Sequence, residues 1–362
     1  MGNKIFIICN FYSIQVWSAI KLHINYISKA GGVPVLIIKK GSASIDTNEL
    51  KGFEIWEYSN LFSLFMHILT AKDVKYVWCP DFIVVIKMFI PCLLSCKKIY
   101  FWVQGILPEE DYMKFHKKYR FYIFNILEYL ALLFSSNYIL VSYSMLDFLQ
   151  KKYCLKKINE KRSIIVPCLS EFSRNFNVIK KPNSYVYIGG LSVWQQFDKT
   201  LLIFKQILKY EKNSVLHVIT FDIEKANRKI NDVFDRDNIS VYSILNRVEI
   251  PNILSQFEYG FIIRECNLVN YVASPIKFAE YLACGVKPIT TNAMPHYVEL
   301  IKKFNCGVIV DYDNLENIEI SHDNDSSNTK KAYDAYFALD RIIELSKNTM
   351  LIEIYLLMLI CS

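Results

Sequence analysis

The chain has 362 residues, 52% of them hydrophobic and 15% aromatic, which is enough for two domains of ordinary size and too apolar for general disorder. Lysine and arginine number 42 against 35 acidic residues, and this net charge of +7 suits a polyanionic ligand or an anionic membrane surface. The basic residues do not form a tail, which disfavours a nucleic-acid-binding protein.

The ten cysteines are scattered, without a C-x-x-C pair or a cysteine–histidine cluster at zinc spacing. We therefore expect no metal site. We also expect no signal peptide, because residues 1–4 lead directly into a short apolar segment. A cytoplasmic location is the default that follows.

Short apolar segments alternate with helical patterns through the first half of the chain. We expect strands at 4–10, 33–39, 54–58, 76–79, 99–103, 138–141 and 163–166, and helices that include 16–29 and 142–153. This alternation predicts a parallel sheet with right-handed crossovers, which binds ligands at the carboxyl ends of its strands. Asn10 begins a loop at such an end. The loop lacks the G-x-G-x-x-G signature, which disfavours a dinucleotide cofactor domain.

Two apolar stretches are candidates for membrane contact. Residues 82–94 are too few to span a bilayer and contain Lys87 and Pro91. Residues 121–141 are numerous enough, but they contain Asn125, Glu128 and Asn137. For this second stretch we expect a buried helix followed by a strand. Peripheral membrane association stays open.

An acidic loop follows the expected strand at 99–103. Gln104, Gly105, Glu109 and Glu110 lie in it, at the carboxyl end of that strand. Acidic side chains also stabilise the start of a helix by interacting with its dipole. A solvated helix N-terminus therefore explains Glu109 and Glu110 at least as well as a ligand-binding role does.

A polar, irregular segment at about 170–184 indicates a domain boundary, and a second series of strands follows it. We expect strands at 185–188, 215–220, 239–242, 259–263, 287–291 and 307–311, again alternating with helices. Gly189 and Gly190 come directly after the first of these strands, and Ser192 follows them. Adjacent glycines let a ligand approach the backbone, and the next helix N-terminus can receive a phosphate.

The stretch 264–285 is the most informative part of the chain. Ser274 is a good N-cap, Pro275 suits the first helical position, and Gly285 is a good helix stop. Lys277 then lies in the first turn, where the helix dipole disfavours a cation unless an anion binds nearby. The N–H groups of Ile276 and Lys277 would be further donors to that anion. An ordinary strand–helix unit with a solvated lysine–glutamate pair is the alternative.

Two further residues complete this candidate site. Arg264 lies just before the loop, at the end of the expected strand, and Glu280 lies one helical turn beyond Lys277. We interpret the stretch as a binding site for a di-anionic group, in which Glu280 accepts hydrogen bonds from hydroxyls.

This stretch resembles the donor-binding segment of bacterial family 4 glycosyltransferases of the surface polysaccharide type. The resemblance implies an α/β protein of GT-B architecture, with two Rossmann-like parallel domains facing across a cleft. Residues 1–178 would form the acceptor-side domain and 179–345 the nucleotide-sugar domain. The apolar segment 346–362 would be a helix that crosses back to the N-terminal domain, with burial against a membrane or a partner as the alternative.

The resemblance is incomplete at two places. Glu280 matches the family's glutamate that holds the ribose or sugar hydroxyls. The family often has an earlier glutamate, eight positions before it, where this chain has Val272. The family's glycine loop usually carries an arginine and a lysine, whereas Gln195 and Gln196 are found here.

The residues and the resemblance together define the candidate site residues. The catalytic candidates, which would stabilise the departing diphosphate, are Arg264, Lys277 and Glu280. The donor-binding candidates are Gly189, Gly190, Ser192, Arg264, Ser274, Pro275, Ile276, Lys277 and Glu280. The acceptor-side candidates are Asn10, Gln104, Gly105 and Glu109. No metal ligand is assigned, because no histidine–cysteine cluster is present.

We therefore expect a hexosyltransferase-like enzyme that needs no cofactor and takes a nucleotide-diphosphate-sugar as co-substrate. The resemblance implies a retaining, metal-independent transfer to a hydroxyl acceptor. Family habit and composition suggest a lipid-linked oligosaccharide of capsule, O-antigen (lipopolysaccharide) or exopolysaccharide assembly, on the inner face of the cell membrane. A catalytically inactive GT-B scaffold that binds a membrane or a partner is the alternative. A sugar-nucleotide epimerase of GT-B shape is less favoured, because its acid–base residues are not visible.

Overall fold

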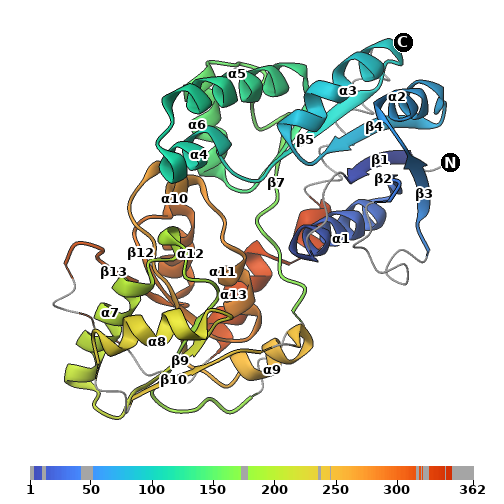
Figure 1. The fold of residues 1–362 in the computed structure, drawn as a ribbon. Helices are drawn as coiled ribbons and strands as arrows, with labels where there is room; N and C mark the ends of the chain where they lie inside the picture. Colours follow the sequence, from blue (N-terminus) through green and yellow to red (C-terminus); the bar gives the residue numbers. More distant parts are fainter. Residues whose placement is uncertain are drawn as a thin grey trace. The chain divides into compact units, whose positions relative to one another are not determined.

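The computed structural model contains two parallel sheets flanked by helices (Figure 1). It describes residues 4–9, 14–41, 52–172, 178–234, 238–244, 246–314, 318, 320, 326–338 and 340–344. The chain divides into two compact units, unit 1 with Met1–Pro167 and Leu339–Ser362, and unit 2 with Cys168–Ala338. The division falls just before the polar segment at about 170–184 where the sequence predicts the boundary, and earlier than the expected end of the first domain at 178. The expected helix at 346–362 lies outside the described residues.

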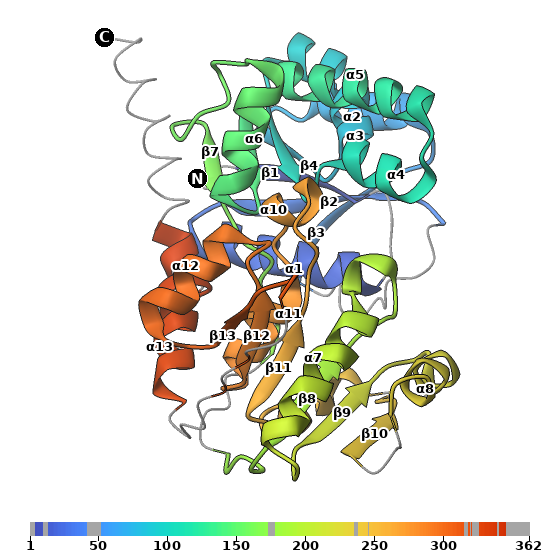
Figure 2. The same ribbon diagram turned by 90° about the vertical axis from the view of Figure 1, so that its left-hand side faces the viewer.

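Unit 1 has a seven-stranded sheet in the order β3-β2-β1-β4-β5-β6-β7. Its strands are β1 Lys4–Cys9, β2 Val33–Lys39, β3 Glu54–Tyr58, β4 Val74–Cys79, β5 Lys98–Val103, β6 Asn137–Leu140 and β7 Ser163–Ile165. Its helices are α1 Ile14–Lys29, α2 Leu61–Thr70, α3 Phe82–Leu94, α4 Leu107–Phe115, α5 Lys118–Phe134 and α6 Tyr143–Tyr153. Figure 2 shows α1 on one side of this sheet and α2, α3 and α5 on the other.

The strands of unit 1 are nearly continuous apolar runs because helices cover both faces of a parallel sheet. Phe6 and Ile7 in β1 are fully buried, for example. His23 of α1 packs against the rings of Trp78 and Trp102, with ring centroids 5.4 and 4.2 Å away. This burial lowers the pKa of His23 to about 3, so the imidazole is neutral and belongs to the core.

Unit 2 has a six-stranded parallel sheet in the order β10-β9-β8-β11-β12-β13. Its strands are β8 Ser184–Ile188, β9 Val215–Ile219, β10 Ile239–Tyr242, β11 Tyr259–Ile262, β12 Lys287–Thr291 and β13 Val308–Val310. Its α-helices are α7 Phe197–Tyr210, α8 Ile223–Asn231, α9 Ile250–Leu254, α10 Leu268–Val272, α11 Ile276–Ala283, α12 Pro295–Phe304 and α13 Ser327–Tyr336. The short 3-10 helices η1 Val193–Gln195 and η3 Arg247–Glu249 lie in its loops.

A close contact between helix and sheet places α11 in the middle of unit 2. Gly260 of β11 faces the ring of Tyr281, and a Cβ at this glycine would lie 2.5 Å from the ring. The absence of a side chain therefore lets α11 approach the sheet, and all but the first residue of this helix are buried. The buried rings of Tyr185, Tyr259 and Phe261 stack across β8 and β11 on the opposite face of the sheet, because side chains alternate along a strand.

Each strand range expected from the sequence contains a strand, but three expectations about helices were wrong. The helix within 121–141 is not buried as a whole, because α5 exposes Tyr122 and Ile126 to solvent. A short helix, α10, interrupts the loop before α11, with Asn267 as its N-cap. Residues 330–345 have a helical pattern that predicts one helix, but α13 ends at Tyr336. Within the described ranges, no helix combines the length and the hydropathy needed to cross a membrane.

Candidate functional site

The direction in which unit 2 adds its strands changes between β8 and β11. From β8 the chain adds β9 and β10 on one side of the sheet, and from β11 it adds β12 and β13 on the other. The loops that follow the carboxyl ends of β8 and β11 therefore lead to opposite sides of the sheet. Open parallel sheets bind ligands at such a point. The Gly189–Gly190 loop follows β8, and Arg264 follows β11 by two residues.

The glycine loop is shaped around the side chain of Lys277. Gly189 has a φ of +130°, and a Cβ there would lie 2.5 Å from the Lys277 Nζ. The same Nζ donates a hydrogen bond to Gln195 Oε1 at 2.7 Å and lies 4.7 Å from the ring centroid of Tyr187. The Tyr187 hydroxyl donates in turn to the carbonyl of Gly190 at 2.5 Å. Lys277 thus reaches from α11 across the end of β8 into the loop.

Arg264 brings a second cation to the same loop. One terminal N–H of its guanidinium donates to the Trp194 carbonyl in η1. Its Nε is buried and has no hydrogen-bond partner among the described residues. The side chain is only 7% exposed. A donor that is buried without an acceptor is costly, so this N–H is available to an incoming anion.

Among the described residues, neither cation forms an ion pair with a carboxylate, although Glu280 acts on Lys277 electrostatically and opposes the lowering of its pKa. Burial and, to a lesser extent, the neighbouring Arg264 lower the pKa of Lys277 to about 7. Burial also lowers the pKa of Arg264 to about 10, against the opposing effect of Tyr187. Both shifts have the same cause, since a charged group loses hydration in the interior. An anion bound here would stabilise the charged forms of both side chains.

Glu280 is the acidic member of the site. It is 8% exposed and lies one turn after Lys277 in α11. Burial raises the pKa of its carboxyl, while Arg247 and Lys277 act in the opposite direction. Its Oε1 lies 3.8 Å from a terminal nitrogen of Arg247 in η3. A buried carboxylate with one long ion pair keeps acceptor capacity for ligand hydroxyls.

The predicted N-cap role of Ser274 was wrong. Pro275 is the N-cap of α11, and no side chain caps this helix. The Ser274 hydroxyl instead pairs with the Tyr297 hydroxyl of α12 at 2.6 Å and accepts from the Cys168 backbone at 3.0 Å. The Ser274 hydroxyl therefore bonds to groups far away in the sequence instead of to the backbone N–H groups at the start of α11. The first turn of α11, including Ile276, keeps the uncapped N–H groups that favour an anion.

The acceptor-side candidates of unit 1 have varied surroundings. Asn10 lies outside the described residues. Gln104 is exposed after β5, and its amide donates to the Pro80 carbonyl after β4 at 3.2 Å. Gly105 faces the Glu110 carboxylate, since a Cβ at this glycine would meet Glu110 Oε1. Gln104 and Gly105 thus lie near the carboxyl ends of two central strands.

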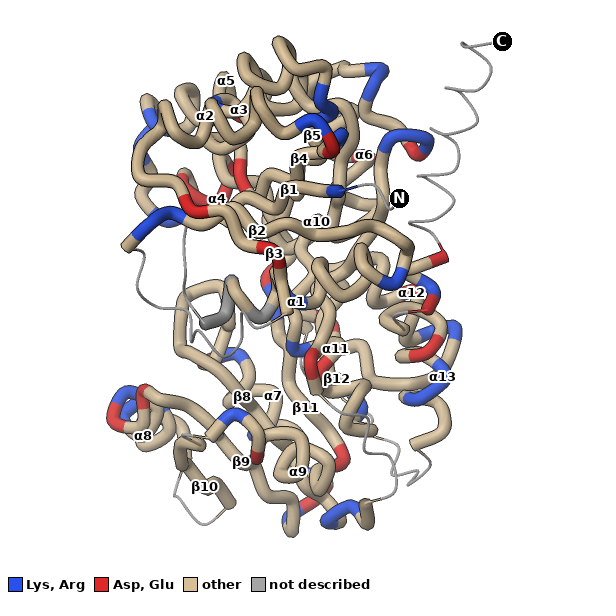
Figure 3. The backbone as a smooth tube through the Cα atoms, turned by 90° about the vertical axis from the view of Figure 1, so that its right-hand side faces the viewer, with Lys and Arg blue, Asp and Glu red and all other residues tan. Residues whose placement is uncertain are grey.

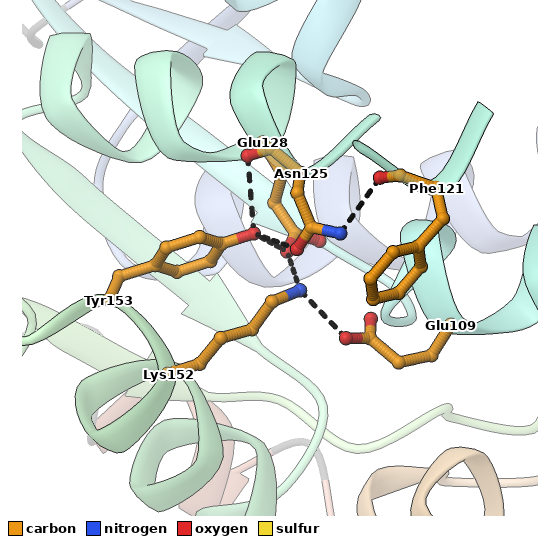
Figure 4. A network of polar contacts seen from close by, with 6 residues as sticks. All are labelled: Glu109, Phe121, Asn125, Glu128, Lys152 and Tyr153. Atoms are coloured by element: carbon orange, nitrogen blue, oxygen red, sulfur yellow. Dashed lines mark hydrogen bonds and ion pairs between the residues drawn. The ribbon is translucent and has the colours of Figure 1, made fainter. Parts of the chain in front are cut away.

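Glu109 belongs to an internal network rather than to a solvated helix start (Figure 4). Its Oε1 lies 2.8 Å from Lys152 Nζ, which also contacts Glu128 Oε2 at 3.0 Å. The Tyr153 hydroxyl donates to that same Glu128 oxygen at 2.6 Å. Burial raises the pKa of Glu128 despite Lys152. The network joins α4, α5 and α6, while Glu109 Oε2 is buried without a hydrogen-bond partner among the described residues.

No group of three or more histidine, cysteine, aspartate or glutamate side chains in the described ranges is arranged to hold a metal ion. Arg264, Lys277 and the uncapped turn of α11 are electropositive groups beside the glycine loop, and Arg247 lies beside Glu280.

Comparison with known proteins identifies the fold. No family model matches the sequence, and no curated protein matches it. Solved structures do match over nearly the whole chain. HepE of Anabaena, in complex with UDP and glucose, has a TM-score of 0.67 at 11% identity, with 96% of this chain and 99% of that chain covered. The lipopolysaccharide outer core galactosyltransferase WaaB has a TM-score of 0.65 at 14% identity, with 97% and 99% covered.

TarM of S. aureus, in a complex that contains UDP, has a TM-score of 0.68 at 9% identity, with 96% of this chain and 99% of that chain covered. The chain has the GT-B fold. This finding confirms the predicted α/β class with two Rossmann-like parallel domains.

Sequence reasoning missed three contributors to the site within this GT-B fold. Arg247 was overlooked because its loop shows no motif, although it lies 3.8 Å from Glu280. Gln195 was noted only as a replacement for missing charge, yet it is the hydrogen-bond acceptor of Lys277. Trp194 contributes a backbone carbonyl, which leaves no signal in the sequence.

Proposed function

We propose that this protein is a glycosyltransferase that transfers a hexose from a nucleoside-diphosphate-sugar bound to unit 2. The observation that carries the proposal is the burial of Arg264 and Lys277 beside the glycine loop, where neither forms an ion pair with a carboxylate among the described residues. A diphosphate is the dianion that such a pair of cations would bind. The solved GT-B relatives in complex with UDP or UDP-glucose support this choice of ligand.

The proposed chemistry uses charge stabilisation of the leaving group. An acceptor hydroxyl oxygen bonds to the anomeric carbon, the bond from that carbon to the diphosphate oxygen breaks, and the hydroxyl proton is released. Negative charge then grows on the diphosphate, where Arg264, Lys277 and the N-terminus of α11 would stabilise it. Glu280 would accept hydrogen bonds from ribose or sugar hydroxyls. No step in this scheme requires a metal ion.

The finer assignments follow the resemblance to family 4 glycosyltransferases. They are retention of the anomeric configuration, and a lipid-linked glycan acceptor in capsule, O-antigen or exopolysaccharide assembly. The net charge of +7 favours an anionic membrane surface as the place of that acceptor. Gln104 and Gly105, near the carboxyl ends of β4 and β5, are the acceptor-side residues that we propose to test first.

Nucleotide binding tests the donor site directly. Calorimetric titration of the full chain with UDP, GDP and ADP should give one preferred nucleotide, with UDP the first to try. Arg264→Met should weaken its binding by roughly tenfold or more, because a charged hydrogen bond is worth about 1.5–3 kcal/mol. Lys225→Met, which removes an exposed lysine of α8, is the control and should bind normally. Equal affinities for both variants would place the nucleotide elsewhere.

A catalytically inactive scaffold is the second candidate. Val272 occupies the position of the family's first glutamate, and it is 1% exposed in α10. An apolar, buried side chain cannot replace that carboxylate. A protein that binds nucleotide but neither transfers nor hydrolyses any sugar of a UDP- and GDP-sugar panel, with a range of membrane-extracted acceptors, would favour the scaffold.

A further inference from the structure

Helix α5 of unit 1 is apolar on the side that faces solvent. Tyr119, Tyr122, Ile123 and Ile126 are 64%, 63%, 50% and 60% exposed, and Leu133 continues the same stripe. Their spacing of three and four residues places them on one face of the helix. The opposite face is buried at Ala131 and Leu132. A helix at the surface of a soluble protein normally has a polar outer face, and α5 does not.

The neighbouring helices α3 and α2 extend this apolar surface. Ile83, Ile90 and Leu94 follow one another at helical spacing on the exposed side of α3, and Leu94 is 71% exposed. On α2 the corresponding stripe includes Phe62, which is 73% exposed, and Met66. The three helices are neighbours, since α3 packs against both α2 and α5 on the same side of the sheet (Figure 1). We call the outer surface of α2, α3 and α5 the helical face.

The exposed charges within the three helices are basic, while Asp73 follows α2 and Asp81 caps the start of α3. The only carboxylate within α2, α3 and α5 is Glu128, which points inward to Lys152. Lys87 is exposed in α3, and Lys117 and Lys118 are exposed where α5 begins. In Figure 3 the three helices are drawn almost entirely in the colour of uncharged residues. An apolar centre with a basic margin and tyrosines is typical of surfaces that lie in a membrane interface.

We propose that the helical face docks onto a lipid bilayer that contains anionic lipids, with its apolar side chains in the headgroup–acyl boundary. The width of the surface favours a membrane over a single covering segment. Packed helices are about 8–10 Å apart, so three of them span more than the ~10 Å width of one added helix. Lys87, Lys117 and Lys118 would contact the anionic headgroups. Membrane docking would bring the enzyme to a lipid-linked acceptor. Only this link to the acceptor rests on the proposed function.

Vesicle co-sedimentation without nucleotide tests the inference on the full chain. The protein should bind vesicles of phosphatidylcholine with phosphatidylglycerol, and bind phosphatidylcholine alone much more weakly. The double variant Ile123→Ser, Ile126→Ser should lower the partition coefficient at least tenfold, because both side chains lose apolar burial. Lys117→Gln and Lys118→Gln should each lower it about fivefold, and added salt should act in the same direction.

A matched control distinguishes binding through the helical face from nonspecific binding by other exposed apolar side chains. Tyr210→Ser removes a side chain that is 70% exposed in unit 2 and should leave vesicle binding unchanged. The proposal is overturned if the wild type does not bind, if the control loses as much as the double variant, or if binding appears only after residues 345–362 are deleted. Dimers that the double variant abolishes, without vesicle binding, would likewise overturn it and assign the face to a second copy. Nucleotide titration of the same variants, which should be normal, distinguishes this failure from failure of the donor site.

Discussion

The side chain of Lys277 is buried beside Arg264, so the free protein carries two desolvated positive charges at one place. Replacing a buried unpaired charge by an apolar side chain of similar size often stabilises a fold. We therefore expect Lys277→Met to melt at the same temperature as the wild type or higher in the absence of ligand. Its affinity for the nucleoside diphosphate should fall, as calorimetry would show. Both effects are needed, since a solvated lysine would produce neither.

The pKa of Lys277 gives this prediction a pH dependence. The folded-state pKa is about 7 against an ordinary value of 10.5, so the unfolded chain binds more protons between these two values. The free energy of unfolding of the wild type should therefore gain from Lys277 as pH rises from about 7 toward 10.5. Lys277→Met lacks that gain. Denaturant titrations at pH 6.5 and 9 should show its stability advantage shrinking at the higher pH, and an unchanged difference would contradict the assignment.

Glu280 is the second residue with a testable role. We expect Glu280→Gln to lower kcat/KM for the donor by a factor that corresponds to about 2 kcal/mol, because hydroxyl hydrogen bonds to a desolvated carboxylate are lost or weakened. Circular dichroism checks that the variant is folded. Glu224→Gln on α8 removes an exposed carboxylate and should have normal kinetics. Normal donor kinetics in a folded Glu280→Gln protein would remove this residue from the site.

At the scale of elements, the loop between β8 and η1 has two glycines that differ in whether a side chain could fit at their positions. A side chain at Gly189 would meet Lys277 and would require a positive φ, whereas nothing lies within 4 Å of a Cβ at Gly190. Gly189→Ala should therefore destabilise the protein by about 1–3 kcal/mol and weaken nucleotide binding. Gly190→Ala should change stability by less than about 1 kcal/mol. Urea titration measures both, and similar losses in the two variants would contradict this account of the loop.

The helix α11 shows how packing changes the meaning of a local motif. Ser274, Pro275 and the first-turn lysine looked like a capped helix with a solvated or ligand-bound cation. In the structure Ser274 bonds to Tyr297, and nearly the whole helix is buried. The uncapped start of α11 and the buried Lys277 both make the site more electropositive than the sequence suggested.

At the scale of the whole molecule, the electropositive groups of the site are side chains and a helix start. Among the described residues, no group of three or more histidine, cysteine, aspartate or glutamate side chains is arranged to hold a metal ion. We therefore expect sugar transfer to continue in excess EDTA, as a coupled assay of nucleotide release would show. Pretreatment with EDTA followed by gel filtration controls for slowly exchanging ions. Activity that disappears and returns only with Mg²⁺ or Mn²⁺ would refute the metal-independent mechanism.

The sequence by itself determined both sheets, because the apolar strands, the helical repeats and the glycine and proline stops are local signals. It also determined that Lys277 and Glu280 lie one turn apart, since the helix period sets that spacing. These features needed no knowledge of distant neighbours.

Only the tertiary structure decided which distant residues meet. Lys277 reaches Gln195 across 82 positions of the chain, and Arg264 reaches Trp194 across 70, because the order of strands places β11 beside β8. The apolar outer stripe of α5 was read as a buried helix for a related reason. Periodicity shows that a helix has apolar faces, but whether each face is covered depends on what packs against it.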